Sequence, residues 1–296
     1  MAHVWIPLPD TDFDVTEVAV PWRLLTRAGH SVTFVTEKGG SPPNADPLLL
    51  TGVLFGQLGA EPQPKEFYRQ LTESAEFRSP LSWDSIDVGA YDGLILPGGH
   101  APGMRQYLGS ESLRLKVRQF FALRRPVGAI CHGVLVAARA DVLRGHRTTC
   151  LAKYMERTAY FLTAWKLGEY YRTDPAYVED EVKAALSCAE DFVRGPLTLT
   201  SRGSETDDRA AFVVESDFYI SARWPGDAYL FAKRFFFFFL FFLALAGNYP
   251  TIISCNVRWQ GEGNGVTLGS VETPWPKWLL ASPRRRCRWS RLSITE

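Results

Sequence analysis

The sequence has no apolar run long enough to cross a lipid bilayer. Its longest run, FFFFFLFFLALA at residues 235–246, has twelve residues, whereas a membrane-spanning helix needs about 20. A membrane anchor is therefore only a minor alternative for this segment. The first residues, MAHVWIPLPD, lack a basic segment followed by a long apolar stretch, so we expect no secretion signal.

Charge of one sign is also scarce. The 33 Lys and Arg residues nearly balance the 32 Asp and Glu residues, which leaves a formal net charge of +1. Residues 247–296 carry seven basic and three acidic side chains, so the preceding part of the chain is slightly acidic. Because a protein that wraps nucleic acid needs a basic surface, we expect no nucleic-acid partner.

Cysteine and histidine are few, with five residues of each. The cysteines form no CxxC pair, and a chain of 296 residues is large enough to fold without disulfides. We therefore expect a reducing, cytoplasmic location, with unpaired structural thiols at Cys150, Cys188, Cys255 and Cys287. The histidines are too scattered for the spacing of a metal site, so we predict neither a metal nor another cofactor.

The rest of the sequence alternates short apolar strands with amphipathic helical patterns. The clearest strand-like segments are HVWIPL, HSVTFVT, YDGLIL and PVGAI. This alternation is typical of a parallel sheet covered by helices on both faces. Residues 45–84 and 154–194 interrupt it and are predicted to form a cap over the sheet edge.

The Phe-rich run sets the predicted end of the domain. It lacks the periodicity by which a helix or strand presents one face to a core, and it would promote aggregation if exposed. A T-rich pyrimidine tract encodes such a run, so a retained intron or a frame error in the gene would produce it. We therefore predict one domain over residues 1–234 and an anomalous tail, residues 235–296, outside the fold.

The sharpest local signal is AICHG at residues 129–133, between an apolar strand and an apolar helix. On such a strand-to-helix turn, Cys131 points out at the carboxyl ends of the strands, where open α/β folds place their sites. The free N–H groups and the positive dipole at the helix start favour a thiolate. Cys131 is thus a candidate nucleophile, and the alternative is a buried structural cysteine.

A second strand ends in a glycine turn, LPGGH at residues 96–100. Gly98 and Gly99 allow backbone N–H groups to turn toward a ligand. The amide of Gly99, together with that of His132, is suited to an oxyanion hole. His100 follows directly and is expected to line the same pocket. Taken alone, Pro-Gly-Gly also marks ordinary turns.

Taken in order, the early TEVAVP segment, the LPGGH turn and the AICHG turn resemble the DJ-1/PfpI superfamily. The resemblance covers about residues 2–234. It implies a three-layer α/β/α sandwich of the flavodoxin-like, class I glutamine amidotransferase-like type, with a mostly parallel sheet and a helical cap, and it implies a homodimer. The histidine directly after the cysteine is similar to the Hsp31 and glyoxalase III branch and to the PfpI-type peptidases.

The resemblance also implies roles for four residues. Cys131 matches the family nucleophile, and His132 matches its general base. Glu17 matches the glutamate that approaches the cysteine sulfur, and Glu156 matches, more loosely, the acid that orients the histidine in the Hsp31 branch. Each carboxyl has an ordinary alternative: Glu17 as a first-turn helix residue, and Glu156 as a solvated helix residue.

The function that this resemblance implies is a cofactor-independent cysteine enzyme acting on small reactive carbonyl compounds. Glyoxalase III-type conversion of methylglyoxal to lactate is the specific expectation. A PfpI-type amidase or peptidase would use the same residues, and a stress-response chaperone or redox sensor without turnover is a third alternative. A glutaminase is disfavoured, because no histidine follows His146 to supply the downstream His-x-Glu pair.

Overall fold

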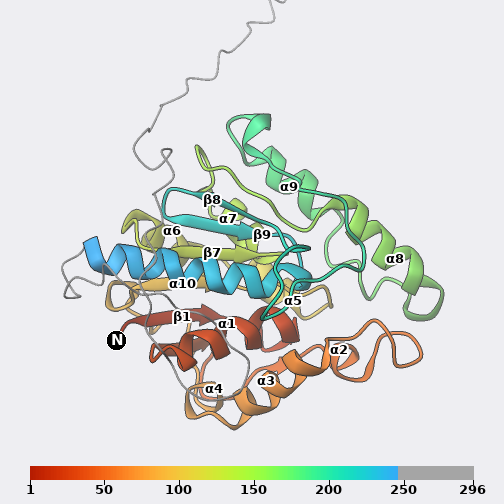
Figure 1. The fold of residues 1–296 in the computed structure, drawn as a ribbon, viewed down its shortest axis with the longest axis horizontal. Helices are drawn as coiled ribbons and strands as arrows, with labels where there is room; N and C mark the ends of the chain where they lie inside the picture. Colours follow the sequence, from red (N-terminus) through yellow and green to blue (C-terminus); the bar gives the residue numbers. More distant parts are fainter. Residues whose placement is uncertain (246–296) are drawn as a thin grey trace, which may run out of the picture.

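The computed structural model describes residues 1–245, and its centre is a seven-stranded sheet (Figure 1). The strand order is β5-β3-β1-β6-β7-β9-β8, and neighbours pair in parallel except for β8 with β9. This confirms the predicted mostly parallel sheet. The strands are β1 (His3–Pro7), β3 (Ser31–Thr36), β5 (Leu81–Ser82), β6 (Gly93–Leu96), β7 (Val127–Ile130), β8 (Val213–Ser216) and β9 (Tyr219–Ala222).

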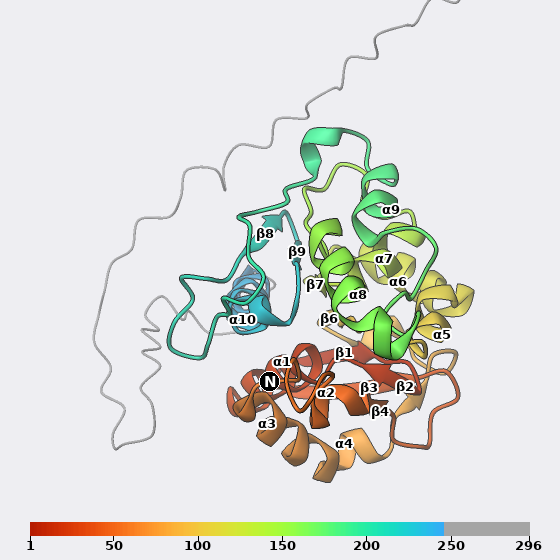
Figure 2. The same ribbon diagram turned by 90° about the vertical axis from the view of Figure 1, so that its right-hand side faces the viewer.

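Helices cover both faces of this sheet, as Figure 2 shows. α1 and α10 lie together on one face, and α5, α6 and α7 lie on the other. The predicted three-layer α/β/α sandwich is thereby confirmed. The helices are α1 (Val15–Arg27), α2 (Pro47–Thr51), α3 (Pro62–Glu73), α4 (Ala75–Arg78), α5 (Met104–Gly109), α6 (Glu111–Ala122), α7 (Gly133–Arg139), α8 (Lys153–Leu167), α9 (Val178–Ala184) and α10 (Ala228–Leu245), and the short strands β2 (Thr11–Phe13) and β4 (Asn44–Ala45) form a small second sheet.

The two predicted cap segments, residues 45–84 and 154–194, contact each other next to the glycine turn at residues 96–100. Residues 45–84 contain α2, α3 and α4, and residues 154–194 contain α9 and most of α8. The carboxylate of Asp46, ahead of α2, accepts a hydrogen bond from the Tyr171 hydroxyl at 2.9 Å. The Tyr171 ring also lies against the ring of His100, with centroids 5.4 Å apart. The two segments therefore come together next to the glycine turn that follows β6.

The Phe-rich run is part of α10 and packs on the sheet. Phe231, Phe235 and Phe239 are spaced four residues apart along the helix, and all three are fully buried. A Cβ atom on Gly128 of β7 would lie 2.6 Å from the Phe231 ring. A Cβ atom on Gly93 of β6 would lie 3.1 Å from the Phe235 ring. Glycine in two central strands thus makes room for the aromatic stripe.

This packing changes the predicted domain boundary. Helix α10 continues to Leu245, so the assignment of residues 235–245 to a tail outside the fold is wrong. The helical period was hidden because every neighbouring position in the run is apolar as well. The rest of the predicted tail, residues 246–296, lies outside the described residues. In the described part of the chain, no helix has the length and apolar character needed to cross a membrane.

The cysteines differ from expectation at one position. Cys131 and Cys150 are free thiols, as predicted for Cys150. Cys188 is disulfide-bonded, so the prediction of an unpaired thiol there is wrong. The predictions for Cys255 and Cys287 fall outside the described residues.

Truncation of one buried ring tests whether the Phe-rich run belongs to the core. We expect Phe235→Ala to lower the free energy of unfolding by about 3–5 kcal/mol, the usual cost of removing a buried phenylalanine ring. Phe237→Ala is the matched control, because Phe237 lies on the same helix with 45% of its surface exposed, and it should lose far less. Urea denaturation measures both losses, and equal values would contradict this packing.

Candidate active site

Cys131 lies on the sharp turn between β7 and α7. Its φ angle is +58°, a left-handed conformation that costs a residue with a side chain about 1–3 kcal/mol. The Cys131 N–H donates to the Ala222 carbonyl of β9 at 3.1 Å, which ties the turn to the neighbouring strand. A Cβ atom on Gly133 would lie 2.0 Å from the Leu96 carbonyl oxygen. The glycine therefore lets α7 begin directly against the end of β6.

The Cys131 thiol is buried, with 4% of the residue exposed. Burial raises the pKa of Cys131 well above its ordinary value, and the charge of Asp14 raises it further. The backbone N–H of His132 acts in the opposite direction, because it hydrogen-bonds to the sulfur and lowers the pKa of Cys131. The expectation of an outward-pointing, readily ionised thiolate is thus corrected: the sulfur is buried and the resting group is a thiol.

Glu17 reaches from α1 to the sulfur. Its Oε2 accepts the Gly98 N–H at 2.7 Å, and its carboxyl also hydrogen-bonds to Cys131. Burial raises the pKa of Glu17 well above 4.5, and the neighbouring Asp14 raises it further, so this carboxyl holds its proton at neutral pH. A protonated carboxyl can donate to the sulfur, which stabilises the thiolate when it forms.

Asp14 places Glu17 and was not recognised in the sequence. Its carboxylate caps α1 by accepting the N–H groups of Thr16 and Glu17 at 2.8 and 3.0 Å. Its own N–H donates to the Gly98 carbonyl at 2.9 Å. The Asp-x-x-Glu spacing is that of a capping box and would have identified this residue, but here Glu17 turns toward Gly98 and Cys131.

The glycine turn brings these groups together. A Cβ atom on Gly98 would lie 2.7 Å from the His132 nitrogen and 2.9 Å from the Cys131 Cβ. The Gly98 N–H is engaged by Glu17, so the expectation that Gly98 serves an oxyanion directly is corrected. Gly99 is equally confined, because its Cβ would lie 2.7 Å from the Asp12 carbonyl oxygen.

Two imidazole rings lie next to the sulfur. His132 Nδ1 is 3.5 Å from Cys131 Sγ, and the rings of His132 and His100 have centroids 4.9 Å apart. Burial lowers the pKa of His132 well below its ordinary value, and the charge of Arg139 contributes to this. Burial, together with the Arg172 charge, lowers the pKa of His100 to about 4. Both rings are therefore neutral at neutral pH and able to accept a proton.

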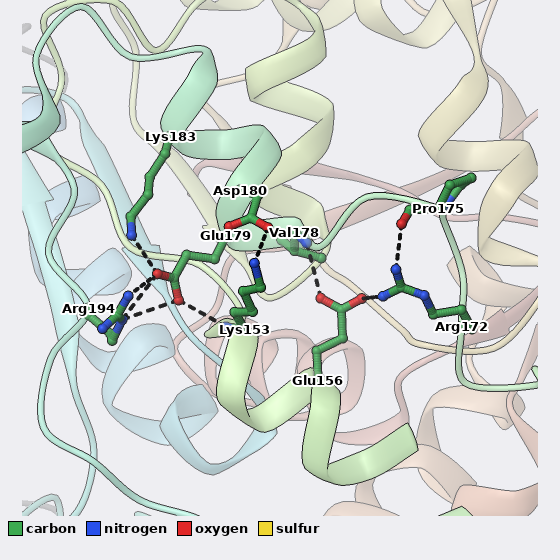
Figure 3. A network of polar contacts seen from close by, with 9 residues as sticks. All are labelled: Lys153, Glu156, Arg172, Pro175, Val178, Glu179, Asp180, Lys183 and Arg194. Carbon is green, nitrogen blue, oxygen red and sulfur yellow. Dashed lines mark hydrogen bonds and ion pairs between the residues drawn. The ribbon is translucent and has the colours of Figure 1, made fainter. Parts of the chain in front are cut away.

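Glu156, near the start of α8, points toward Val178 and Arg172 (Figure 3). Its Oε2 accepts the Val178 N–H at 3.0 Å, and its Oε1 lies 3.5 Å from Arg172 Nη1. Burial raises the pKa of Glu156 to about 7 against the opposing effects of the Val178 N–H and the Arg172 charge. One side-chain ligand atom from each of Glu156, His132 and His100 lies within 4.8 Å of the others. Among the described hydrogen bonds, those of Glu156 go to Val178 and not to His132.

A second buried carboxylate holds the segment around Glu156 in place. Glu179 Oε2 accepts the Lys153 N–H at 2.9 Å, so the first residues of α8 and α9 each donate to a carboxylate on the other helix (Figure 3). Lys183 and Arg194 pair with Glu179, and these partners outweigh its burial, which holds the pKa of Glu179 to about 2. Sequence reasoning missed Glu179 and Arg172, because no local spacing signals these contacts.

The protonated state of Glu17 has a measurable effect on stability. The folded protein holds a proton on Glu17 that the unfolded chain releases above about pH 4.5, so stability from this group is complete below that pH and is lost as pH rises. Glu17→Gln avoids this loss. We expect it to gain about 1.4 kcal/mol per pH unit relative to wild type above that pH, measured by urea denaturation. Glu73→Gln, at an exposed carboxyl of α3, is the control, and an unchanged pH slope for Glu17→Gln would contradict the assignment.

Curated relatives match between about half and three quarters of this chain. A curated relative from Schizosaccharomyces pombe, an uncharacterised protein, is 29% identical over 236 residues, which are 77% of this chain and 80% of the relative. Protein/nucleic acid deglycase 2 of Escherichia coli is 39% identical over 141 residues, 47% of this chain and 66% of that protein. A deglycase of Pyrococcus horikoshii is 28% identical over 142 residues, 48% of this chain and 68% of that protein.

Solved structures show the same fold. The rapid encystment protein of Francisella tularensis superposes with a TM-score of 0.59 at 18% identity, covering 81% of this chain and 99% of that one. Glyoxalase III of Candida albicans superposes with a TM-score of 0.54 at 15% identity, covering 79% and 96%. The family model described as ThiJ/PfpI family-like matches residues 8–196. That match spans more than half of the sequence and confirms the resemblance to the DJ-1/PfpI superfamily: the chain belongs to the ThiJ/PfpI-like family.

Proposed function

We propose that this protein is a cofactor-independent cysteine enzyme that converts small reactive carbonyl compounds, with the glyoxalase III-type reaction of methylglyoxal to lactate as its specific activity. The observation that carries the proposal is the convergence of the Glu17 carboxyl and the His132 ring on the Cys131 sulfur. Relatives named deglycases and a structural neighbour named glyoxalase III support this class of reaction.

The chemistry follows from the proton positions. His132 Nδ1 takes the thiol proton as Cys131 Sγ adds to the aldehyde carbon, and the protonated Glu17 stabilises the sulfur before the bond forms. The N–H groups of Gly99 and His132 then hold the hemithioacetal oxygen. The His132 N–H, which contacts the sulfur at rest, turns to this oxygen, because a sulfur bonded to carbon is a much weaker hydrogen-bond acceptor than an oxyanion.

The second half is an internal transfer. His132 first returns the thiol proton to the hemithioacetal oxygen and is again a neutral base. It then moves the proton of the aldehyde-derived carbon to the neighbouring carbonyl carbon, while the hydroxyl proton passes to the oxygen of that carbonyl, which converts the hemithioacetal into a lactyl thioester. In this proposal Glu156, whose ligand atom lies within 4.8 Å of that of His132, turns its Oε1 toward the ring during turnover and orients it. Water then cleaves the thioester, releasing lactate and restoring the Cys131 thiol. The sum is methylglyoxal plus water to lactate, with no net oxidation.

Burial favours a small substrate over a peptide. Cys131, His132 and Glu156 are each at most 4% exposed. An extended polypeptide therefore does not reach the sulfur unless the two cap segments, residues 45–84 and 154–194, rearrange. A two- or three-carbon aldehyde requires much less space. The raised pKa of buried Cys131 also disfavours a redox sensor, because oxidation follows thiolate character and exposure.

A chaperone role is a second candidate function, because large apolar side chains are exposed on the two cap segments. Phe55, Phe161 and Trp165 are each at least 67% exposed, and the Phe55 and Trp165 rings stack with centroids 6.2 Å apart. Aggregation assays with Cys131→Ser separate the two roles, since holding unfolded proteins does not need the thiol. The homodimer and the cytoplasmic location stay predictions.

Replacement of each buried thiol tests the nucleophile. We expect Cys131→Ser to abolish lactate formation from methylglyoxal, because serine has no comparably ionisable group at this position. Cys150→Ser is the matched control, since Cys150 is also a buried free thiol and donates only to the Leu151 carbonyl, and it should stay active. Full activity in Cys131→Ser would overturn the proposal, and hydrolysis of amides without lactate formation would favour the PfpI-type alternative.

A single added methyl group tests the packing at the glycine turn. Gly98→Ala would press a Cβ atom against the His132 nitrogen and the Cys131 Cβ, so these groups must shift. We expect kcat to fall by about 10²-fold or more, since displacements of about 1 Å have this effect on positioned groups. Gly109→Ala is the control, because its Cβ would meet no atom within 4 Å. Wild-type turnover in Gly98→Ala would contradict the described geometry.

A further inference from the structure

Two ring nitrogens beside Cys131 have no hydrogen-bond partner within the protein. His100 Nε2 and His132 Nε2 are both buried atoms without a partner, and His132 is only 1% exposed. The two rings come from different turns, one after β6 and one at the start of α7, and their centroids are 4.9 Å apart. Because buried polar atoms are nearly always paired, two neutral acceptors facing one region call for a ligand.

Glu156 supplies a third donor at the same point. Ligand atoms of His100, His132 and Glu156 all lie within 4.8 Å of one another. Two imidazoles and one carboxylate are a donor set that Zn²⁺ uses in three-ligand sites, with the fourth position left to water or substrate. Bonds of about 2.0–2.1 Å in a tetrahedral site put ligand atoms about 3.4 Å apart, so ligand atoms that are 4.8 Å apart need to approach each other by about 1.4 Å.

The surroundings allow Glu156 to make this movement. Its Oε1 is held only by the 3.5 Å contact with Arg172 Nη1, while Oε2 keeps the Val178 N–H. Arg172 has other partners, because its Nη2 donates to the Pro175 carbonyl and its guanidinium lies 4.0 Å from the Tyr177 ring centroid. The positive charge of Arg172 disfavours a cation at this position. Rotation of Glu156 Oε1 toward the histidines places a negative charge between Arg172 and the metal, which reduces this repulsion.

We propose that His100, His132 and Glu156 form a binding site for a divalent transition metal of the Zn²⁺ type, and that an occupied site switches off the chemistry at Cys131. The sequence predicted no metal, because these positions are 32 and 24 residues apart and show no ligand spacing. The three ligands come together only in the folded protein: His100 lies on the turn after β6, His132 lies on the turn between β7 and α7, and Glu156 lies on α8.

The inhibitory effect follows from the tautomer of His132. A metal on Nε2 leaves the ring proton on Nδ1, and Nδ1 is the atom that lies 3.5 Å from Cys131 Sγ. This nitrogen then donates toward the sulfur and cannot accept the thiol proton. Inhibition rests on the proposed function, whereas metal binding itself does not.

Binding is tested on the full-length Cys131→Ser protein, in which neither turnover nor the Cys131 thiol contributes. We expect one equivalent of Zn²⁺ by calorimetry, and Co²⁺ should show the visible absorption of a four-coordinate site. In this background, His100→Ala and Glu156→Gln should each weaken binding by more than the roughly 10- to 100-fold that loss of an outer partner costs. His146→Ala removes a half-buried imidazole outside the site and should leave binding unchanged.

The outcomes are distinct. Unchanged binding in His100→Ala, with thermal melts showing a folded protein, overturns the site, and so does binding that requires the Cys131 thiol. If wild-type protein forms lactate, Zn²⁺ should stop it and a chelator should restore it; full turnover with the site occupied overturns the switch. If wild-type protein forms no lactate, the proposed function fails, and the Co²⁺ spectra still decide the metal site.

Discussion

The site depends on one close approach that only glycine allows. At Gly98, the chain after β6 passes so near to the β7–α7 turn that a single methyl group would collide with the His132 nitrogen and with Cys131. The same residue anchors α1, because its carbonyl accepts the Asp14 N–H and its N–H donates to Glu17. Three elements from distant parts of the chain are thus brought to the sulfur through one backbone position.

Burial then determines the protonation states around that sulfur. With almost no solvent contact, ionised groups are disfavoured, so the thiol, the Glu17 carboxyl and the two imidazoles are all neutral at rest. Burial likewise favours the uncharged form of Glu156, whose pKa is raised to about 7. Glu179 is buried as well, but it stays ionised because the cationic side chains of Lys183 and Arg194 pair with it. The uncharged groups around the sulfur thus lie near an ion-paired carboxylate, Glu179, that holds α8 and α9 in place.

The comparison of sequence and structure shows where local patterns are sufficient. Strand and helix alternation predicted the parallel sheet and its layers, and the turns at residues 96–100 and 129–133 lie where the patterns placed them. The Phe-rich run was assigned wrongly, because its buried stripe is visible only against the glycines of β6 and β7. Cys188 was also assigned wrongly, since spacing along the chain does not identify the partner of a disulfide.

The sequence by itself determined the order of elements, the strand-to-helix turn that carries Cys131, and the glycine turn beside it, because each depends on residues adjacent in the chain. Tertiary structure alone decided that the thiol is buried and neutral, that Asp14 and Arg172 act on Glu17 and Glu156, and that two histidines and a carboxylate converge. Such properties depend on distances between residues far apart in sequence and on the exclusion of water, and neither is encoded in local spacing.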